Sequence, residues 1–244
     1  MKETIEGIVI SETSYGETSK IINILTKDGI IGCMAKGAKQ LKSNLRSVTT
    51  KLTYGKFIIN KKIDKLSLLT SVDVINNLNE IKKDIVKMSY SIYLLELTEQ
   101  VIKQNKNEKI YNLLIETLEK INEKFDPLVL TNILELKYLE YLGVLPVLDG
   151  CSICGSKTNI VTLSGNSGGY ICKNCLTTEK MVKEKTIKLV RMFYYVDIKK
   201  IDKLEISEEI KREVNNFLEN YYDRYTGLYL KSKSFLKDVI YGKL

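Results

Sequence analysis

Four of the five cysteines in this 244-residue chain form two C-x-x-C pairs, Cys151 with Cys154 and Cys172 with Cys175. Seventeen residues separate the two pairs, a spacing typical of two knuckles that fold back on one another and present four thiolates to one metal ion. Zinc is the ion expected for such a ligand set. Because four sulfurs complete a tetrahedral shell, the pattern predicts one structural zinc with no open position for catalysis.

Two other interpretations of these cysteines stay open at this point. They could form a redox-active dithiol or disulfide, or the module could keep its ligands without holding a metal. Small secreted domains with many structural disulfides are much richer in cysteine than this chain, so cross-linking of that kind is disfavoured. Glycines beside the pairs favour the tight turns of metal knuckles, namely Gly155, Gly165, Gly168 and Gly169.

The composition, 44% hydrophobic and 28% charged, is ordinary for a globular chain long enough to form more than one core. No run approaches the roughly 20 apolar residues that span a bilayer. The first residues, MKETIEGIVI, lack the long apolar stretch of a signal peptide. We therefore expect a cytoplasmic protein with no membrane partner, in a reducing compartment that suits thiolates held for zinc.

Several classes of enzyme are excluded by the residues themselves. The chain contains no histidine, which removes Ser-His-Asp and Cys-His nucleophilic systems and imidazole acid–base chemistry. Neither a phosphate-binding loop of the G-x-x-x-x-G-K-[ST] type nor a G-x-G-x-x-G motif is present. Cys33 follows an apolar run and is expected to be an inert strand thiol. The sequence thus predicts a protein that is not an enzyme.

The net charge of +8 is concentrated in one window, residues 36–65, which holds nine basic residues and one acid, Asp64. The other residues sum to zero. A general lysine bias of the chain is the alternative explanation, but such a bias would spread acids as well as bases. Clustered cations gain from releasing counterions around a polyanion, so we expect a DNA-binding surface here. Its candidate residues are Lys36, Lys39, Lys42, Arg46, Lys51, Tyr54, Lys56 and Lys61.

Short strands dominate the first 75 or so residues. Turn signals separate five segments rich in β-branched and aromatic residues, at 4–11, 19–26, 29–37, 50–60 and 65–75. Five such strands predict an OB-type barrel, with an SH3-like barrel as the alternative. In the last strand Leu66, Leu68, Val72 and Val74 are expected on one face. Tyr54 and Phe57 have opposite parity, so at least one of them should lie in the core, and an aromatic among cations suits base stacking.

From about residue 81 the hydrophobic period becomes helical. Apolar residues mark two stripes, one with Ile85, Met88, Ile92, Leu95 and Ile102 and a second with Ile110, Leu114, Leu118 and Ile121. A third helix should begin after Asp126 as N-cap and end at Gly143. Three more helices are predicted after the cysteine module, one of them capped by Ser207.

The predicted fold class is therefore α+β and multidomain. It consists of an N-terminal five-stranded OB-type barrel, followed by an α-helical bundle with an inserted four-cysteine zinc module. The expected boundaries are 1–80 for the barrel, 81–148 with 181–244 for the helices, and 149–180 for the module.

This layout resembles that of the RecO recombination-mediator family. Three stretches carry the resemblance: GIVISETSYGETSKIINILTKDGIIGCMAKGAK at the start, CSICG followed by SGGYICKNC in the module, and FLENYYDRYTGLYLKSKSFLKDV near the end. The resemblance spans nearly the whole chain and keeps the order of the motifs.

The resemblance implies a non-catalytic DNA-binding protein of bacterial recombinational repair, associated with the nucleoid. Members of the family bind single- and double-stranded DNA and anneal complementary strands. They engage the acidic C-terminal tail of the single-stranded DNA-binding protein SSB, and they work with RecR and RecF so that RecA can load.

Two other functions compete with this interpretation. One is an enzyme acting on nucleic acid with Asp or Glu and a transient Mg²⁺, although the constellations that such sites use are not evident in the sequence. The other is a zinc-containing nucleic-acid-binding or protein-interaction module of transcription or RNA metabolism. In that case the knuckles would touch the partner, yet the segment between them has Lys157 as its only basic residue before Lys173.

Overall fold

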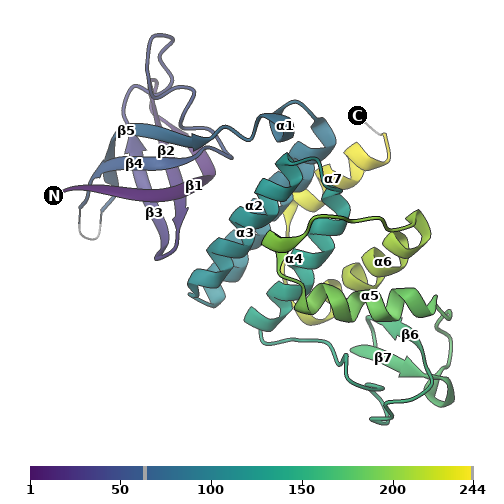
Figure 1. Cartoon of the computed structure of the whole chain (residues 1–244). Helices are drawn as coiled ribbons and strands as arrows, with labels where there is room; N and C mark the ends of the chain where they lie inside the picture. Colours follow the sequence, from purple (N-terminus) through teal and green to yellow (C-terminus); the bar gives the residue numbers. More distant parts are fainter. Residues whose placement is uncertain (63–64, 243–244) are drawn as a thin grey trace. The chain divides into compact units, whose positions relative to one another are not determined.

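The chain, seen in a computed structural model that describes residues 1–62 and 65–242, divides into two compact units. One unit comprises Met1–Glu123 and Leu230–Leu244, and the other comprises Lys124–Tyr229. The chain thus leaves the first unit, builds the second, and returns to the first with its last helix (Figure 1). No helix in the described ranges is long and apolar enough to cross a membrane.

Five strands of the first unit form a closed barrel in the order β1-β2-β3-β5-β4 (Figure 1). Their bounds are Lys2–Tyr15 for β1, Ser19–Thr26 for β2, Gly29–Ala35 for β3, Tyr54–Asn60 for β4 and Ser67–Asn76 for β5. Neighbouring strands are antiparallel except β3 and β5, which pair in parallel at Cys33–Ser67 and Met34–Leu68. This is the OB-type barrel that the strand count predicts, and the helices that follow make the chain α+β.

Strand β1 is buried on both of its faces, which explains its uninterrupted apolar run. Val9 belongs to the barrel core, where it joins Phe57 of β4. Ile10 points the other way and lines a hollow together with Ile92, a residue of the helix that packs outside the barrel. A strand that is covered on both faces loses the alternation of a half-exposed strand.

The inward face of β5 differs from the predicted one, which comprised Leu66, Leu68, Val72 and Val74. Its pairing with β4 jumps from Ile59–Leu69 to Ile58–Ser71, so one extra residue interrupts the register. Before this bulge the inward side chains have odd numbers, and Leu69 is buried in the core. Leu66 and Leu68, which precede the bulge and have even numbers, lie outside this core, whereas after the bulge the parity changes and Val72 packs against it. A bulge inverts the faces of a strand, so a strict period of two was the wrong assumption here.

Four helices complete the described part of the first unit: α1 Asn79–Lys82, α2 Ile85–Gln104, α3 Glu108–Asn122 and α7 Lys231–Ile240. Asp84 caps α2 by accepting hydrogen bonds from Val86 N and Lys87 N, at 2.9 and 3.1 Å. Leu95 and Ile102 of the predicted first stripe are buried, but Ile85 is 60% exposed because it lies in the first turn.

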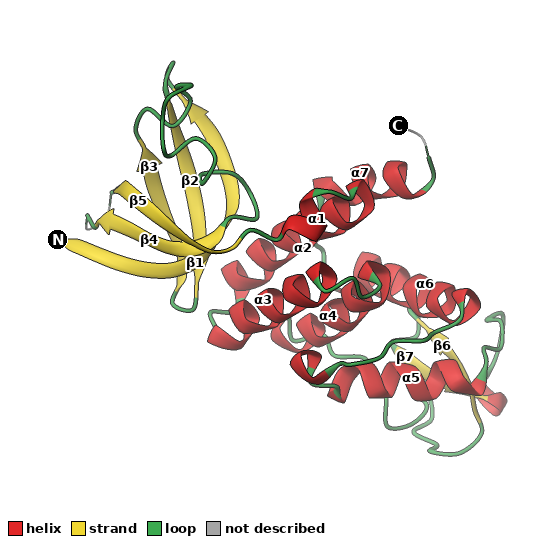
Figure 2. Ribbon diagram, turned by 45° about the horizontal axis from the view of Figure 1, so that its top comes forward, coloured by secondary structure: helices red, strands yellow, loops and turns green. Residues whose placement is uncertain are grey.

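The second unit contains three helices, α4 Pro127–Tyr141, α5 Glu184–Tyr195 and α6 Glu208–Tyr225, with a two-stranded sheet of β6 Ile160–Ser164 and β7 Gly169–Cys172 (Figure 2). Short 3-10 turns follow at Lys173–Cys175 (η1) and Ile198–Lys200 (η2). Asp126 is the N-cap of α4, as predicted. Ser207 lies at the N-cap position of α6, but its hydroxyl makes no capping hydrogen bond, so that part of the prediction was wrong.

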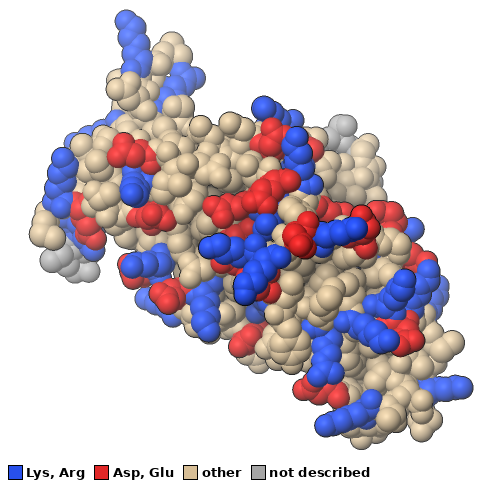
Figure 3. All heavy atoms as spheres, viewed as in Figure 1, with Lys and Arg blue, Asp and Glu red and all other residues tan. Residues whose placement is uncertain are grey.

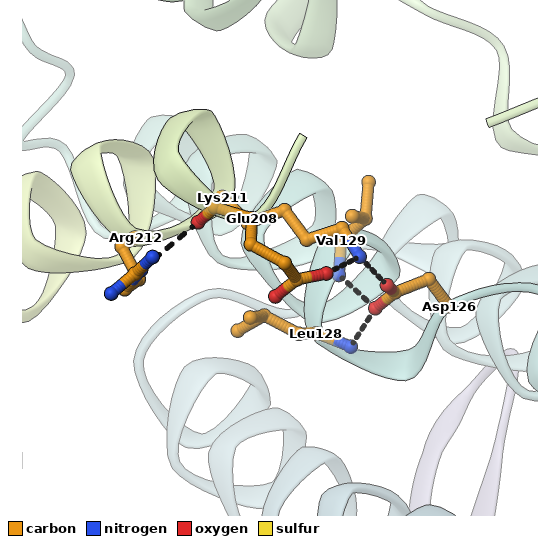
Figure 4. Close-up of polar contacts among 6 residues, drawn as sticks. All are labelled: Asp126, Leu128, Val129, Glu208, Lys211 and Arg212. Carbon is orange, nitrogen blue, oxygen red and sulfur yellow. Dashed lines mark hydrogen bonds and ion pairs between the residues drawn. The ribbon is translucent and has the colours of Figure 1, made fainter. Parts of the chain in front are cut away.

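Asp126 also ties the start of α4 to α6 (Figure 4). One carboxylate oxygen accepts from Leu128 N at 2.9 Å and Val129 N at 3.2 Å, while the other accepts from the ammonium of Lys211. Lys211 donates to Glu208 as well, at 2.7 Å, and its side chain is only 13% exposed. The bonds to Asp126 and Glu208 raise the pKa of Lys211, so the charge that links the two helices is held firmly.

Candidate functional site

The turns around β6 and β7 bring the four predicted metal ligands together. The sulfur atoms of Cys151, Cys154, Cys172 and Cys175 all lie within 4.8 Å of one another, and those of Cys154 and Cys172 are 3.7 Å apart. Four sulfurs at the usual zinc distance of about 2.3 Å from a central ion lie roughly 3.8 Å from each other. The cluster therefore has the size of a tetrahedral four-thiolate site, and the four cysteines are placed to bind a metal ion.

Backbone hydrogen bonds shape the first knuckle around this cluster. Gly155 N donates to Cys151 O at 2.8 Å, and Cys151 N donates to Ser156 O at 2.8 Å. Gly155 has a φ of +75°, a conformation that residues with a Cβ rarely adopt. In the second knuckle Cys172 ends β7 and Cys175 lies in η1. Backbone turns thus hold both ligand pairs of the cluster.

The thiols of the cluster differ in acidity. Burial raises the pKa of Cys151, but hydrogen bonds from the backbone of Cys172, Cys154 and Ile153 outweigh this and lower it to about 6. The side chains of Cys154 and Cys172, together with the charge on Cys151, raise the pKa of Cys175 to about 12. Four neighbouring thiolates repel one another, so a divalent cation is what allows all four protons to leave.

The module that carries these cysteines is fastened to the rest of the second unit. Val147 N donates to Gly168 O at 2.9 Å, and Tyr170 N donates to Val147 O at 3.0 Å. A Cβ on Gly169 would lie 2.2 Å from Val147 O, so only glycine allows this close approach. Tyr225 of α6 donates its hydroxyl proton to Asn166 O at 2.9 Å.

Residues 36–53, the first part of the basic window, form an ordered loop at the end of the barrel where β3 stops and β4 starts. Three successive turns build it, with hydrogen bonds from Gln40 N to Gly37 O (3.0 Å), Ser43 N to Gln40 O (3.1 Å) and Arg46 N to Ser43 O (3.1 Å). Figure 3 shows Lys and Arg side chains standing out at this end of the barrel, at the upper left, without acidic side chains among them. We call residues 36–53 the cationic loop.

The predicted DNA-binding cations fall into two groups. Lys36, Lys39, Lys42 and Arg46 are all exposed on the cationic loop. Within the described ranges Lys36, Lys42 and Arg46 make no ion pair. Their charge is therefore available to an external anion.

The remaining cations lie in other surroundings. Lys51, at the end of the loop, donates its backbone N–H to Glu12 at 3.4 Å. Lys56 of β4 is opposite Glu6 of β1 and Asp73 of β5, so acids flank it on both sides. Lys61 pairs with Glu3 at 3.1 Å, and it follows β4 at the far end of the barrel, roughly 20 Å from the loop at the rise of an extended strand. Asp64, the one acid of the window, lies outside the described residues.

Tyr54 is placed differently from Phe57. Phe57 is fully buried in the barrel core, as the parity argument required of one of the two. Tyr54 is only 8% exposed, and its hydroxyl donates to Glu6 at 2.7 Å. Burial and the bond to Glu6, with Tyr111 of α3 nearby, raise the pKa of the Tyr54 phenol. Its ring is covered, which leaves little surface on which a base could stack.

An exposed aromatic that the sequence analysis missed lies beside the cationic loop. Tyr15 ends β1, pairs with Ser19 across the hairpin and is 52% exposed. Lys39 fixes the loop to this hairpin, since its N–H donates to Thr18 O at 2.8 Å and its ammonium to Gly16 O at 3.2 Å. The sequence does contain a feature that indicates this exposure, because Tyr15 directly precedes the hairpin turn, where no other element covers a side chain.

An OB-type barrel with an ordered cationic loop, joined to helices that carry a closed four-cysteine metal module, defines the class of this protein. Comparison with known sequences gives the family. Residues 1–78 match the family described as "Recombination protein O N terminal", and residues 82–234 match "Recombination protein O C terminal".

Curated relatives agree with both matches over nearly the full length. The chain is 37% identical over 242 residues to the DNA repair protein RecO of Listeria monocytogenes serotype 4b (strain F2365), covering 97% of this chain and 94% of the relative. It is 36% identical over 244 residues to the DNA repair protein RecO of Bacillus cytotoxicus, covering 98% of each. The chain belongs to the RecO family of DNA repair proteins.

Proposed function

We propose that this chain is a non-catalytic recombination mediator that binds single- and double-stranded DNA through the cationic loop and anneals complementary strands. In this role it helps RecA to load on SSB-coated DNA together with RecR and RecF. The observation that carries the DNA-binding part is the ordered loop on an OB-type barrel, on which Lys36, Lys42 and Arg46 are exposed and make no ion pair among the described residues.

The chemistry of the loop favours contacts with phosphates. Lysine is a point charge that recognises phosphate and carries no base-specific pattern here, so binding should be nearly independent of sequence. Tyr15 stands beside these cations with half of its side chain exposed, and a base of a single strand can stack on its ring. Sequence-independent contacts of this kind suit annealing, because any two complementary strands can be brought together.

Zinc is the ion proposed for the cysteine module, and its role is structural. Four sulfur ligands favour zinc over harder ions, and they leave no position for a water or a substrate. When bound, the ion would hold the two knuckles closed and thereby stabilise β6, β7 and their contacts with Val147 and Tyr225.

The acidic tail of SSB is the proposed partner of the second unit. A cavity of about 460 Å³ lies between α5 and the start of α6, with apolar walls from Leu189, Met192, Ile206 and Ile210. Lys185, Lys188 and Glu205 line the same cavity, and Lys188 also pairs with Glu184 at 2.5 Å. An apolar groove beside two cations complements a peptide that combines acidic and hydrophobic residues.

The tail proposal predicts a charge-dependent interaction. Lys185→Glu combined with Lys188→Glu should weaken binding of the tail peptide about tenfold or more at low salt, since each reversal replaces attraction by repulsion. Fluorescence anisotropy with a labelled tail peptide measures this. Lys157→Glu combined with Lys199→Glu, which carries the same charge change elsewhere in the second unit, should bind normally. Equal affinity of both double variants would contradict the assignment of the groove.

The proposed function as a whole is tested by strand annealing. The purified protein should accelerate pairing of complementary oligonucleotides and bind strands of unrelated sequence with similar affinity. A variant with Lys39→Glu, Lys42→Glu and Arg46→Glu should lose most of this activity. Lys103→Glu, Lys106→Glu and Lys109→Glu together change the charge equally around the junction of α2 and α3 and serve as the control. Annealing that is unaffected by the loop variant would contradict the proposal.

A further inference from the structure

Leu41 is an exposed apolar residue of the cationic loop. Its side chain is 85% exposed, whereas the next most exposed leucine, isoleucine or valine side chains among the described residues, Ile85 and Ile153, are at 60% and 59%. Single exposed apolar residues are common on protein surfaces, so exposure alone assigns no role. The surroundings of Leu41 distinguish it from them.

The loop backbone holds Leu41 in a fixed outward position. Ser43 N donates to Gln40 O at 3.1 Å, which closes a β-turn with Leu41 and Lys42 as its two central residues. The turn before it is anchored by Ala38, which is fully buried in the barrel core. Side chains at the two central positions of a turn point away from the chain. The hydrogen-bonded turn therefore directs the Leu41 side chain outward.

Cations flank this apolar residue in the sequence of the loop. Lys39 precedes Leu41 by two residues, Lys42 follows it directly, and Arg46 closes the next turn. A polyanion attracted by these charges is brought against Leu41. In duplex DNA the phosphates lie outside and the apolar surfaces of the base pairs lie between them, which matches an apolar side chain flanked by cations.

We propose that Leu41 is a wedge that enters between adjacent base pairs of duplex DNA and unstacks them, while Lys39, Lys42 and Arg46 hold the flanking phosphates. This inference rests on the proposed DNA binding of the loop and adds a deformation of the duplex to it. Apolar wedges such as leucine unstack base steps in other DNA-binding proteins, at a cost that the added contacts offset. A loosened step gives a paired strand an opening at which it can exchange partners.

The test uses the full-length, metal-loaded protein and a duplex that contains 2-aminopurine, whose fluorescence rises when the base unstacks. Wild-type protein should raise the fluorescence, and Leu41→Ser should abolish the rise. Leu41→Ser should also bind duplex about threefold to tenfold more weakly, the loss expected when part of one leucine side chain is no longer buried. Its salt dependence should match wild type, because no phosphate contact is lost, and its affinity for single strands should change little.

Two further variants complete the experiment. Leu41→Phe keeps an apolar wedge and should keep the fluorescence rise. Tyr229→Ser removes a side chain of similar exposure, 79%, between α6 and α7 and should behave as wild type. A duplex that is bound without any fluorescence rise, or a rise that survives in Leu41→Ser, would overturn the wedge and leave the DNA-binding proposal standing. Wild-type protein that binds no duplex at all would overturn the proposed function itself.

Discussion

Glu96 shows how one side chain can join elements that are far apart in the sequence. It lies within α2, and its carboxylate accepts hydrogen bonds from Lys231 N at 3.0 Å and Ser232 N at 2.8 Å, 135 and 136 residues further on. The hydroxyl of Ser232 also donates to it. Helix α7 has no capping side chain of its own, so Glu96 acts as its N-cap from another helix. Partial burial raises the pKa of Glu96, but the bonds from Ser232 and Lys231 outweigh this and lower it.

Replacement of Glu96 should therefore loosen α7. Glu96→Gln is expected to cost about 1 kcal/mol of unfolding free energy at pH 7, the usual loss for a helix cap. A carboxylate whose pKa is lowered by folding stabilises the fold above its unfolded pKa, near the ordinary 4.5, and this stabilisation is lost as the pH falls through the folded value. Urea unfolding at pH 7 and at acid pH measures both effects.

Glu99→Gln is the matched control for this experiment. Glu99 lies one turn further along α2 and pairs with the exposed Lys103 at 3.0 Å, a contact that contributes little. It should leave the unfolding free energy nearly unchanged. Equal stability of Glu96→Gln and wild type at every pH would show that the cap is not used.

Individual residues also show which parts of the site could be predicted from the sequence and which could not. The four cysteines were found from their spacing, because a closed metal site restricts its ligands to a few patterns. Lys56 and Lys61 look like Lys42 in the sequence, but their acidic neighbours come from other strands, as Glu6 and Glu3. Partners that pairing of distant strands creates are not visible in a local window, so the cations proposed to bind DNA could be predicted only as a set.

At the scale of elements, the four-cysteine module should depend more on a bound metal ion than on a core of its own. β6 and β7 are only five and four residues long, and a sheet of two short strands is marginal by itself. The contacts of Gly168 and Gly169 with Val147 hold the sheet against the rest of its unit, while the cysteines close its open end. The ion should therefore contribute much of the folding free energy of the module.

Loss of two ligands tests this dependence. The purified protein should contain one zinc ion, and the variant Cys172→Ser with Cys175→Ser should contain almost none. Amide hydrogen exchange in β6 and β7 should become fast in this variant, while the barrel keeps its protection. Cys33→Ala, which alters the one cysteine outside the cluster, should keep its zinc. Full zinc content in the double variant, measured by elemental analysis, would contradict the metal site.

Elements were predictable where local chemistry determines them. Asp126 before Pro127 identifies the start of α4, because a capping carboxylate and an N-terminal proline act within one turn. The faces of β5 were not predictable, because the bulge beside Leu69 arises from pairing with β4 and leaves no mark in the pattern of Leu66 to Val74. Ser207 lies at the N-cap position of α6, but its hydroxyl does not form the capping hydrogen bond. The position of a residue alone does not determine the rotamer of its side chain.

At the scale of the whole molecule, the order of barrel, helices and module could be predicted from the sequence and its resemblance to a family. The return of the chain from the second unit to the first could not be predicted. Lys124–Tyr229 form a second unit, and the chain then re-enters the first so that α7 packs on α2. That return depends on Glu96 and on the apolar face around Leu236, which look like ordinary parts of amphipathic helices.

The central claim is that the cationic loop of the barrel is the DNA interface, and the salt dependence of DNA affinity tests it most directly. Each phosphate contact on a single strand contributes about 0.7 to the slope of log affinity against log salt. Reversing Lys39, Lys42 and Arg46 to Glu should therefore weaken binding to all sequences alike and flatten the slope by roughly 2. Thermal stability should hardly change, because exposed loop charges contribute little to folding. A folded triple variant with unchanged affinity and an unchanged slope would contradict the claim.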